Sequence, residues 1–282
     1  MHHTLIHRLT LPAAILAIVF TLFAEKTMAL AGIIYGVRDL GNQFVVSSID
    51  LTDQGFAAEL LVGNKPAQER IRDIILLADG RLTLLRINVV RDAQSDRSNI
   101  EFLGDPLEGL QQRPQDTIRL KGLPLAHGAS TATRSNGGSG QPLKTLVSHF
   151  TDTPPYSAGV IDLATSQVST LPIQLHEQAR FANLTLCPDG ITYGTSLGIQ
   201  GGGVHLVRMD FELGGFTDIA KLRFEGKSLR DDLKSLTCSS SGELFVLGDP
   251  SYRGFNSLFL IDPLTGDLTF VRAFDVDFIT SR

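Results

Sequence analysis

Short apolar segments alternate with polar turns along most of the chain. Five of these segments share one form, in which an apolar residue directly precedes an acidic one: Ile49-Asp50, Ile100-Glu101, Ile161-Asp162, Met209-Asp210 and Ile261-Asp262. The form recurs roughly every 50 residues, which is the length of a repeated supersecondary unit. The chain is therefore predicted to contain about five β-rich units.

Turn signals stand at matching places within these units. Asp79-Gly80, Asp189-Gly190 and Ser241-Gly242 each precede a β-rich segment, and glycine adopts the positive φ that tight hairpins require. A unit of this length supplies about four strands, the size of one propeller blade. Helical periodicity is scarce, which argues against a doubly wound fold or a TIM barrel.

The end of the chain repeats a strand that opens earlier units. Phe278-Ile279-Thr280 matches Asn183-Leu184-Thr185 and Ser235-Leu236-Thr237, but no turn or partner strand follows it. A suitable partner stands at the other end of the chain, at Ile33–Gly36. The sequence thus predicts an all-β fold, a β-propeller of about five four-stranded blades whose ring is closed by pairing of the C-terminal and N-terminal strands.

The unit 257–271 also carries a resemblance. In Ile261-Asp262-Pro263-Leu264-Thr265-Gly266 a strand ends in Ile-Asp and a Thr-Gly turn leads to the next strand. This resembles the repeat of the bacterial β-propeller superfamilies, with no subfamily identified, and implies the fold alone, because those superfamilies include lectins, glycosidases, quinoproteins and assembly factors. The quinone-cofactor branch carries tryptophan in its repeats, and this chain has 0 tryptophans.

The first segment predicts export. Arg8 precedes an apolar run, and Ala29-Leu30-Ala31 offers the small residues that a signal peptidase requires. Residues 1–31 are predicted to be a signal peptide, with an uncleaved anchor as the alternative, and 32–282 a single β-propeller domain located in the periplasm or outside the cell. The small polar segment 128–142 is predicted to be a flexible insert.

Charge and cysteine content limit the partners further. The net charge is −5 and no dense Lys/Arg block occurs, so nucleic acid is a poor candidate partner. No segment after the signal peptide is long and apolar enough to span a membrane. Cys187 and Cys238 are either a disulfide or two buried thiols.

The candidate binding site lies in the loops that follow the first strand of each unit. Such loops are expected to meet on one face of a propeller. Asp39, Asp152 and Asp249 would supply oxygen ligands for Ca²⁺, the one cofactor the pattern suggests. The same loops contain residues suited to an anionic or sugar ligand: Arg38, His149, Tyr156 and Arg253.

No specific catalytic constellation emerges. Gly194-Thr195-Ser196-Leu197-Gly198 has the letters of a nucleophile elbow but not its strand-turn-helix context. The leading hypothesis is an exported, non-catalytic propeller that binds a ligand, a glycan or a protein partner on one loop face. A carbohydrate-active hydrolase or lyase, which needs two nearby carboxylates, and an envelope assembly or scaffold factor, which needs an exposed patch, are the alternatives.

Overall fold

The structure is a computed structural model. It describes residues 32–53, 55–67, 69–76, 82–91, 96–103, 120–123, 132–134, 144–149, 157–162, 167–172, 180–197, 202–210, 215–230 and 233–281. In these ranges every helix or strand is a β-strand. The prediction of an all-β chain is confirmed.

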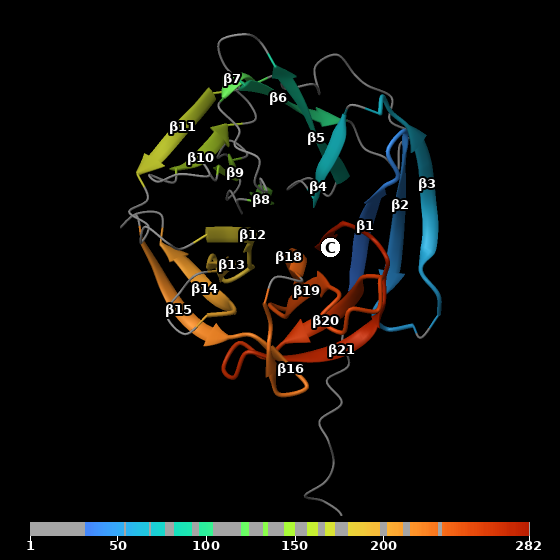
Figure 1. Cartoon of the computed structure of the whole chain (residues 1–282), viewed down its shortest axis with the longest axis vertical. Coiled ribbons are helices and arrows are strands. Elements are labelled where there is room, and N and C mark those ends of the chain that lie inside the picture. The colour runs from blue at the N-terminus through green and yellow to red at the C-terminus, as the bar shows by residue number, and fades with distance from the viewer. Residues whose placement is uncertain are drawn as a thin grey trace, which may run out of the picture. The chain divides into compact units, whose positions relative to one another are not determined.

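The described strands form five sheets (Figure 1). The first contains, in spatial order, β22 (Phe278–Ser281), β1 (Ile33–Asp39), β2 (Gln43–Asp50) and β3 (Ala58–Asn64). The second contains β4 (Arg70–Leu76), β5 (Leu82–Arg91), β6 (Asp96–Leu103) and β7 (Leu120–Leu123). The third contains β8 (Ala132–Arg134), β9 (Lys144–His149), β10 (Ser157–Asp162) and β11 (Gln167–Pro172).

The two remaining sheets come from the C-terminal half. One contains β12 (Arg180–Leu186), β13 (Thr192–Leu197), β14 (Val204–Asp210) and β15 (Gly215–Lys221). The other contains β18 (Leu233–Cys238), β19 (Leu244–Gly248), β20 (Ser257–Ile261) and β21 (Asp267–Ala273), extended at its outer edge by β16 (Arg223–Phe224) and β17 (Lys227–Ser228). Apart from the parallel pair of β16 and β21, neighbouring strands are antiparallel, so each sheet is a meander of the kind found in propeller blades.

The two ends of the described chain meet in the first sheet. Strand β22 pairs with β1 in antiparallel register, from Ile34 opposite Ser281 to Val37 opposite Phe278. Strand β22 also contacts β18 and β4. The last strand of the sequence therefore stands beside the first, as the permuted sequence pattern predicted.

Apolar side chains fill the space between the sheets in two neighbouring pairs. One cluster joins the first two sheets and includes Val37, Phe44, Ile74 and Leu84, each at most 2% exposed. Gly63 lies directly against the Phe44 ring of this cluster. A Cβ at this position would clash with the ring, so only glycine fits there. A second cluster joins the sheets of β12–β15 and β18–β21.

Two of the recurring acidic residues, Asp50 and Asp262, cap turns. Asp50 accepts hydrogen bonds from the backbone N–H and the hydroxyl of Thr52, at 2.8 and 2.6 Å. Asp262 does the same for the Leu264 N–H at 2.9 Å and the Thr265 hydroxyl at 3.0 Å. These bonds explain why the acid recurs at strand ends, since Asp readily bonds backbone two residues further on.

The structure describes part of the predicted insert and none of the predicted signal peptide. Within the predicted insert 128–142, residues Ala132–Arg134 form β8, which pairs with β9. A three-residue strand there differs from a loop without structure, and its β-branched central residue Thr133 suits an extended backbone. The remainder of the insert and the predicted signal peptide 1–31 lie outside the described residues.

Candidate functional site

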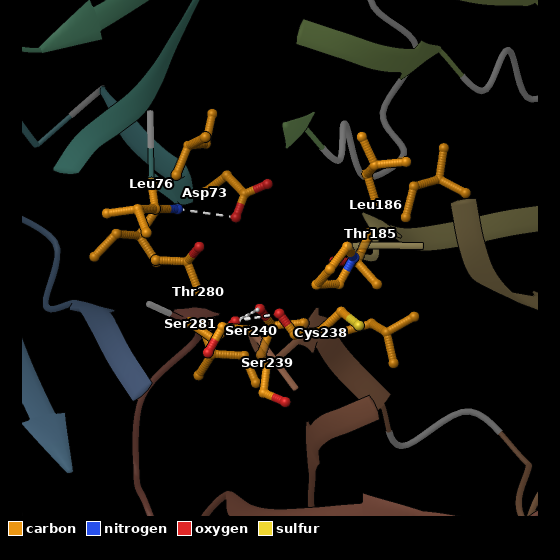
Figure 2. A pocket seen from close by; sticks show the side chains of 16 residues that line it. Asp73, Leu76, Thr185, Leu186, Cys238, Ser239, Ser240, Thr280 and Ser281 are labelled. Atoms are coloured by element: carbon orange, nitrogen blue, oxygen red, sulfur yellow. Dashed lines mark hydrogen bonds between the residues drawn. The ribbon is translucent and has the colours of Figure 1, made fainter. Parts of the chain in front are cut away.

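A cavity of about 270 Å³ lies among four of the innermost strands. Its walls come from the C-terminal halves of β4, β12, β18 and β22 and from the turns that follow β12 and β18. Figure 2 shows these side chains converging from separate sheets on one space. A site built from several sheets depends on how they pack together, which no single repeat encodes.

Bulges recur near the start of three inner strands and help to aim their side chains. The pairing register shifts between Ile71 and Asp73 in β4, between Ala182 and Thr185 in β12, and between Leu233 and Ser235 in β18. A β-bulge redirects the side chains beside it. Buried polar residues stand at these bulges: Asp73, Asn183 and Ser235.

Asp73 directs a carboxyl group into the cavity. It is the one ionisable side chain among the described residues that line the cavity, its residue is 4% exposed, and Figure 2 shows the carboxyl group directed into the space. Oδ1 accepts the Ile74 N–H at 2.9 Å. This bond helps to fix the orientation of the carboxyl group.

Hydroxyl groups cover much of the remaining wall. Ser281 and Thr237 are bonded to each other at 3.1 Å, and Ser281 also donates to the carbonyl of Cys238. Ser239 bonds Glu243 at 2.8 Å. Within the described part of the chain, no hydrogen bond occupies the other three hydroxyls of the lining, those of Thr185, Ser240 and Thr280. These three groups are available to a polar ligand.

A disulfide fixes one side of the cavity. Cys187, directly after β12, is bonded to Cys238 at the end of β18, with a Cα–Cα distance of 5.2 Å. Cys238 itself lines the cavity. Of the two alternatives that the sequence left open, the structure contains the disulfide.

Asp39 accepts hydrogen bonds from the protein's own backbone. Its carboxylate accepts the N–H groups of Gly41 at 2.9 Å and Ile71 at 3.0 Å and pairs with the Lys65 ammonium at 3.0 Å. The Lys65 and Asp39 side chains are 1% and 10% exposed. These contacts give Asp39 a structural role, and its role as a calcium ligand stays a prediction.

The other loop residues are distributed over several places. Arg38 forms an ion pair with Asp275 at 2.7 Å. Asp249 accepts the backbone N–H groups of Arg253 at 2.8 Å and Gly254 at 2.6 Å, so the structure brings these loop residues together. Across the described residues, no contact links Asp39 with Asp249. His149 ends β9, its side chain lies outside the description, and Asp152 and Tyr156 lie outside the described residues.

A further polar group was not found by sequence reasoning. His205 in β14 contacts both oxygens of Asp218 through Nδ1 at 3.0 Å, and it stands opposite Ser196 in the β13–β14 ladder. These are the residue types of a serine-hydrolase triad. However, Ser196 is 1% exposed and its hydroxyl donates to the Leu197 carbonyl at 3.5 Å, so a substrate has no access to it.

An exposed apolar set lies at the edge strand β3. Phe56, Leu60 and Val62 are 102%, 40% and 49% exposed, as the assembly-factor alternative would require. Leu60 is the extra residue of a bulge opposite Val46 and Ser47. A bulge at a sheet edge hinders pairing with a further strand, so this edge gives that alternative little support.

The described residues contain neither a metal-binding group of side chains nor a membrane-spanning helix. No three or more His, Cys, Asp or Glu side chains there are grouped so as to hold a metal ion. Nor does any helix in those ranges have the length and apolar character needed to cross a membrane.

Comparisons with known proteins give structural similarity alone. No family model and no curated protein matches the chain. TolB from Acinetobacter baumannii is 19% identical with a TM-score of 0.49, over 93% of this chain and 57% of TolB. A puromycin hydrolase mutant is 16% identical with a TM-score of 0.43, over 85% and 38% of the respective chains.

A third solved structure, a protein from Bacteroides caccae, is 11% identical with a TM-score of 0.44, over 89% and 99% of the respective chains. This chain thus spans less than two thirds of TolB and of the hydrolase. Similarity of this degree transfers no activity, since one fold hosts many functions.

Proposed function

We propose that the five sheets are the blades of a closed propeller. The support comes from the innermost strands, because β22 contacts β4, β4 contacts β8, β8 contacts β12, β12 contacts β18, and β18 contacts β22. Each inner strand thereby has two neighbours, and no blade is left with an open side. The cavity lies along this set of strands.

We further propose that the protein is exported. The segment 1–31 has the composition of a signal peptide. A disulfide between Cys187 and Cys238 persists in an oxidising compartment such as the periplasm or the cell exterior. Both features favour the same location, although they arise from separate parts of the chain.

The proposed activity is binding of a small, amine-bearing polyol in the cavity, without catalysis. The observation that carries it is the carboxyl group of Asp73, the one ionisable side chain of the described lining, in a wall that also holds the hydroxyls of Thr185, Ser240 and Thr280. An ammonium group would pair with the carboxylate in a charge-assisted contact, while ligand hydroxyls would bond to the three side chains. An anion would meet only repulsion from Asp73.

The size of the cavity restricts the ligand to about one sugar ring. Its volume of about 270 Å³ is near the lower limit for small-molecule pockets. Glycosidases use two carboxylates, and the described lining offers one. Binding is therefore favoured over hydrolysis.

A thermal-shift experiment on the full chain tests this function. Glucosamine, glucose and glucuronate share a ring of similar size but carry a positive, a neutral and a negative charge, respectively. A ligand that binds the native state raises the melting temperature, so glucosamine is expected to raise it most and glucuronate not at all. A rise with glucuronate, or no rise with any of the three, would contradict the proposal.

A further inference from the structure

A second hollow lies outside the cavity, between the β16–β17 hairpin and the loop after β19. Its volume is about 780 Å³, within the range of pockets that enclose small ligands. One wall contains Glu225, Lys227 and Arg230, and the other contains Tyr252 and Arg253. Strand β16 stands beside β21 in Figure 1, which places the hairpin wall at the outer edge of that sheet. We call this hollow the rim groove.

The groove is positively charged although the whole chain is negative. Lys227, Arg230 and Arg253 face one carboxylate of the lining, that of Glu225, whereas the net charge of the chain is −5. Within the described residues, no ion pair or hydrogen bond occupies the side chains of these three cations. Their charge is available to an anion from solution.

Contacts that do not use the cations hold the hairpin wall. Arg223 donates from its backbone to the Gly266 carbonyl at 2.9 Å and from its guanidinium to the Thr265 carbonyl at 2.8 Å. Phe224 packs edge-on against Phe259 with ring centroids 5.1 Å apart. The hairpin is thus fixed against the sheet before any ligand arrives.

The loop wall is fixed in a similar way. The carboxylate of Asp249 accepts the backbone N–H groups of Arg253 and Gly254 at 2.8 and 2.6 Å, and its carbonyl accepts the Tyr252 N–H at 3.0 Å. Asp249 therefore shapes the loop from within. Tyr252 is 71% exposed at the tip of the loop that these bonds hold.

Each of the two walls contains a turn residue with positive φ. Glu225 and Tyr252 have φ values of 51° and 54° and are two of the three non-glycine residues with positive φ among those described. Glu225 precedes Gly226, whose φ is 75°, and two successive residues with positive φ form the two-residue turn that joins β16 to β17. Positive φ therefore belongs to the tight turns that shape the two walls.

We propose that the rim groove binds an acidic saccharide. A sugar ring presents a flat face of C–H groups that suits an exposed tyrosine ring, and its carboxylate would accept hydrogen bonds from Arg253 with Lys227 or Arg230 nearby. The cations alone would hold any small anion. Tyr252, at the tip of the fixed loop, selects an anion that carries a sugar ring.

The test is calorimetric titration of the full chain with digalacturonate, with lactose as the neutral disaccharide and inorganic phosphate as the anion without a ring. Digalacturonate is expected to bind and lactose not to bind. Arg253→Gln keeps the backbone bonds to Asp249 and should weaken digalacturonate binding about tenfold, the value of one charged hydrogen bond. Tyr252→Asn, which tolerates positive φ, should weaken it as well.

Arg208→Gln provides the matched control, since Arg208 is an exposed cation of β14 outside the groove. It should leave the affinity unchanged. The proposal is overturned if digalacturonate fails to bind, or if Arg208→Gln weakens binding as much as Arg253→Gln. It is also overturned if phosphate binds equally well and Tyr252→Asn has no effect. Asp73→Asn should not alter this titration, which separates the groove from the cavity.

Discussion

The side chain of Ser235 connects the last strand of the chain to its neighbour. Its Oγ accepts the Ile279 N–H at 3.1 Å and lies 3.4 Å from the Ile279 carbonyl oxygen, to which it donates. Strand β22 is thus paired with β1 on one side. On the other side, hydrogen bonds from side chains of β18 hold it. This relationship carries the proposed closure of the propeller.

Ser235→Ala tests the strength of that connection. Ser235 is 5% exposed, so the variant leaves the buried Ile279 amide without its partner, which should lower the free energy of unfolding by about 1–3 kcal/mol. Urea unfolding measures the change. Ser251→Ala, at an exposed serine, is the control and should be neutral. Equal stabilities of the two variants would show that the contact contributes little to closure.

Reduction of the Cys187–Cys238 disulfide should lower the stability of the protein and release one side of the cavity. The bond closes a loop with a sequence separation of 51, and a disulfide of this kind contributes about 2–4 kcal/mol. The paired variant Cys187→Ala and Cys238→Ala is expected to melt at a lower temperature than the native protein without reductant. Reductant should affect the native protein but leave the variant unchanged, and a reductant-sensitive variant would contradict the assignment.

Asp39→Ala distinguishes a structural aspartate from a calcium ligand. The variant leaves Lys65, whose side chain is 1% exposed, without its counter-charge, and loss of one partner of a buried pair costs about 3–5 kcal/mol. Thermal unfolding with and without Ca²⁺ provides the measurement. The native protein should show the same melting temperature in both conditions. A calcium-dependent rise that Asp39→Ala abolishes would restore the metal hypothesis.

Asp277 gives stability a defined pH dependence. Burial raises the pKa of its carboxyl group, and the negative charge of Asp39 raises it further, against a hydrogen bond from the Asp39 N–H. Since the folded state then binds the proton more tightly than the unfolded chain, this group favours folding at acid pH, and that contribution is lost as pH rises through the folded pKa.

Asp277→Asn removes this pH dependence while its amide oxygen still accepts the Asp39 N–H. The stability of the variant relative to the native protein should therefore increase as the pH is raised from the acid range to neutrality. Unfolding free energies measured across that range check the sign. An opposite trend would mean that the ionised Asp277 is stabilised in the folded state.

The strand order was predictable because it depends on local signals. Two of the acids that end units, Asp50 and Asp262, cap turns, and the turn glycine Gly242 has a φ of 90°. The pairing of β22 with β1 followed from a strand left over at each end. These features recur with the repeat and are therefore visible in one sequence.

The site was less predictable because it depends on contacts between sheets. Asp39 and Asp249 had the residue type and spacing of ligands, but their carboxylates bond to nearby backbone amides. Asp73 was not selected as a site residue, and it stands at a bulge that the sequence does not mark. Arg253 was selected for its loop, whereas Tyr252 and the hairpin wall of the groove were missed.

The most direct test of the proposed binding function is the affinity of glucosamine for the native chain and for Asp73→Asn, measured by calorimetry. Asp275→Asn, which alters a carboxylate outside the cavity lining, is the control. We expect Asp73→Asn to weaken binding about tenfold or more, because a charge-assisted contact becomes a neutral one, and Asp275→Asn to bind as the native chain does. Unchanged affinity in Asp73→Asn would contradict the assignment of the cavity as the binding site.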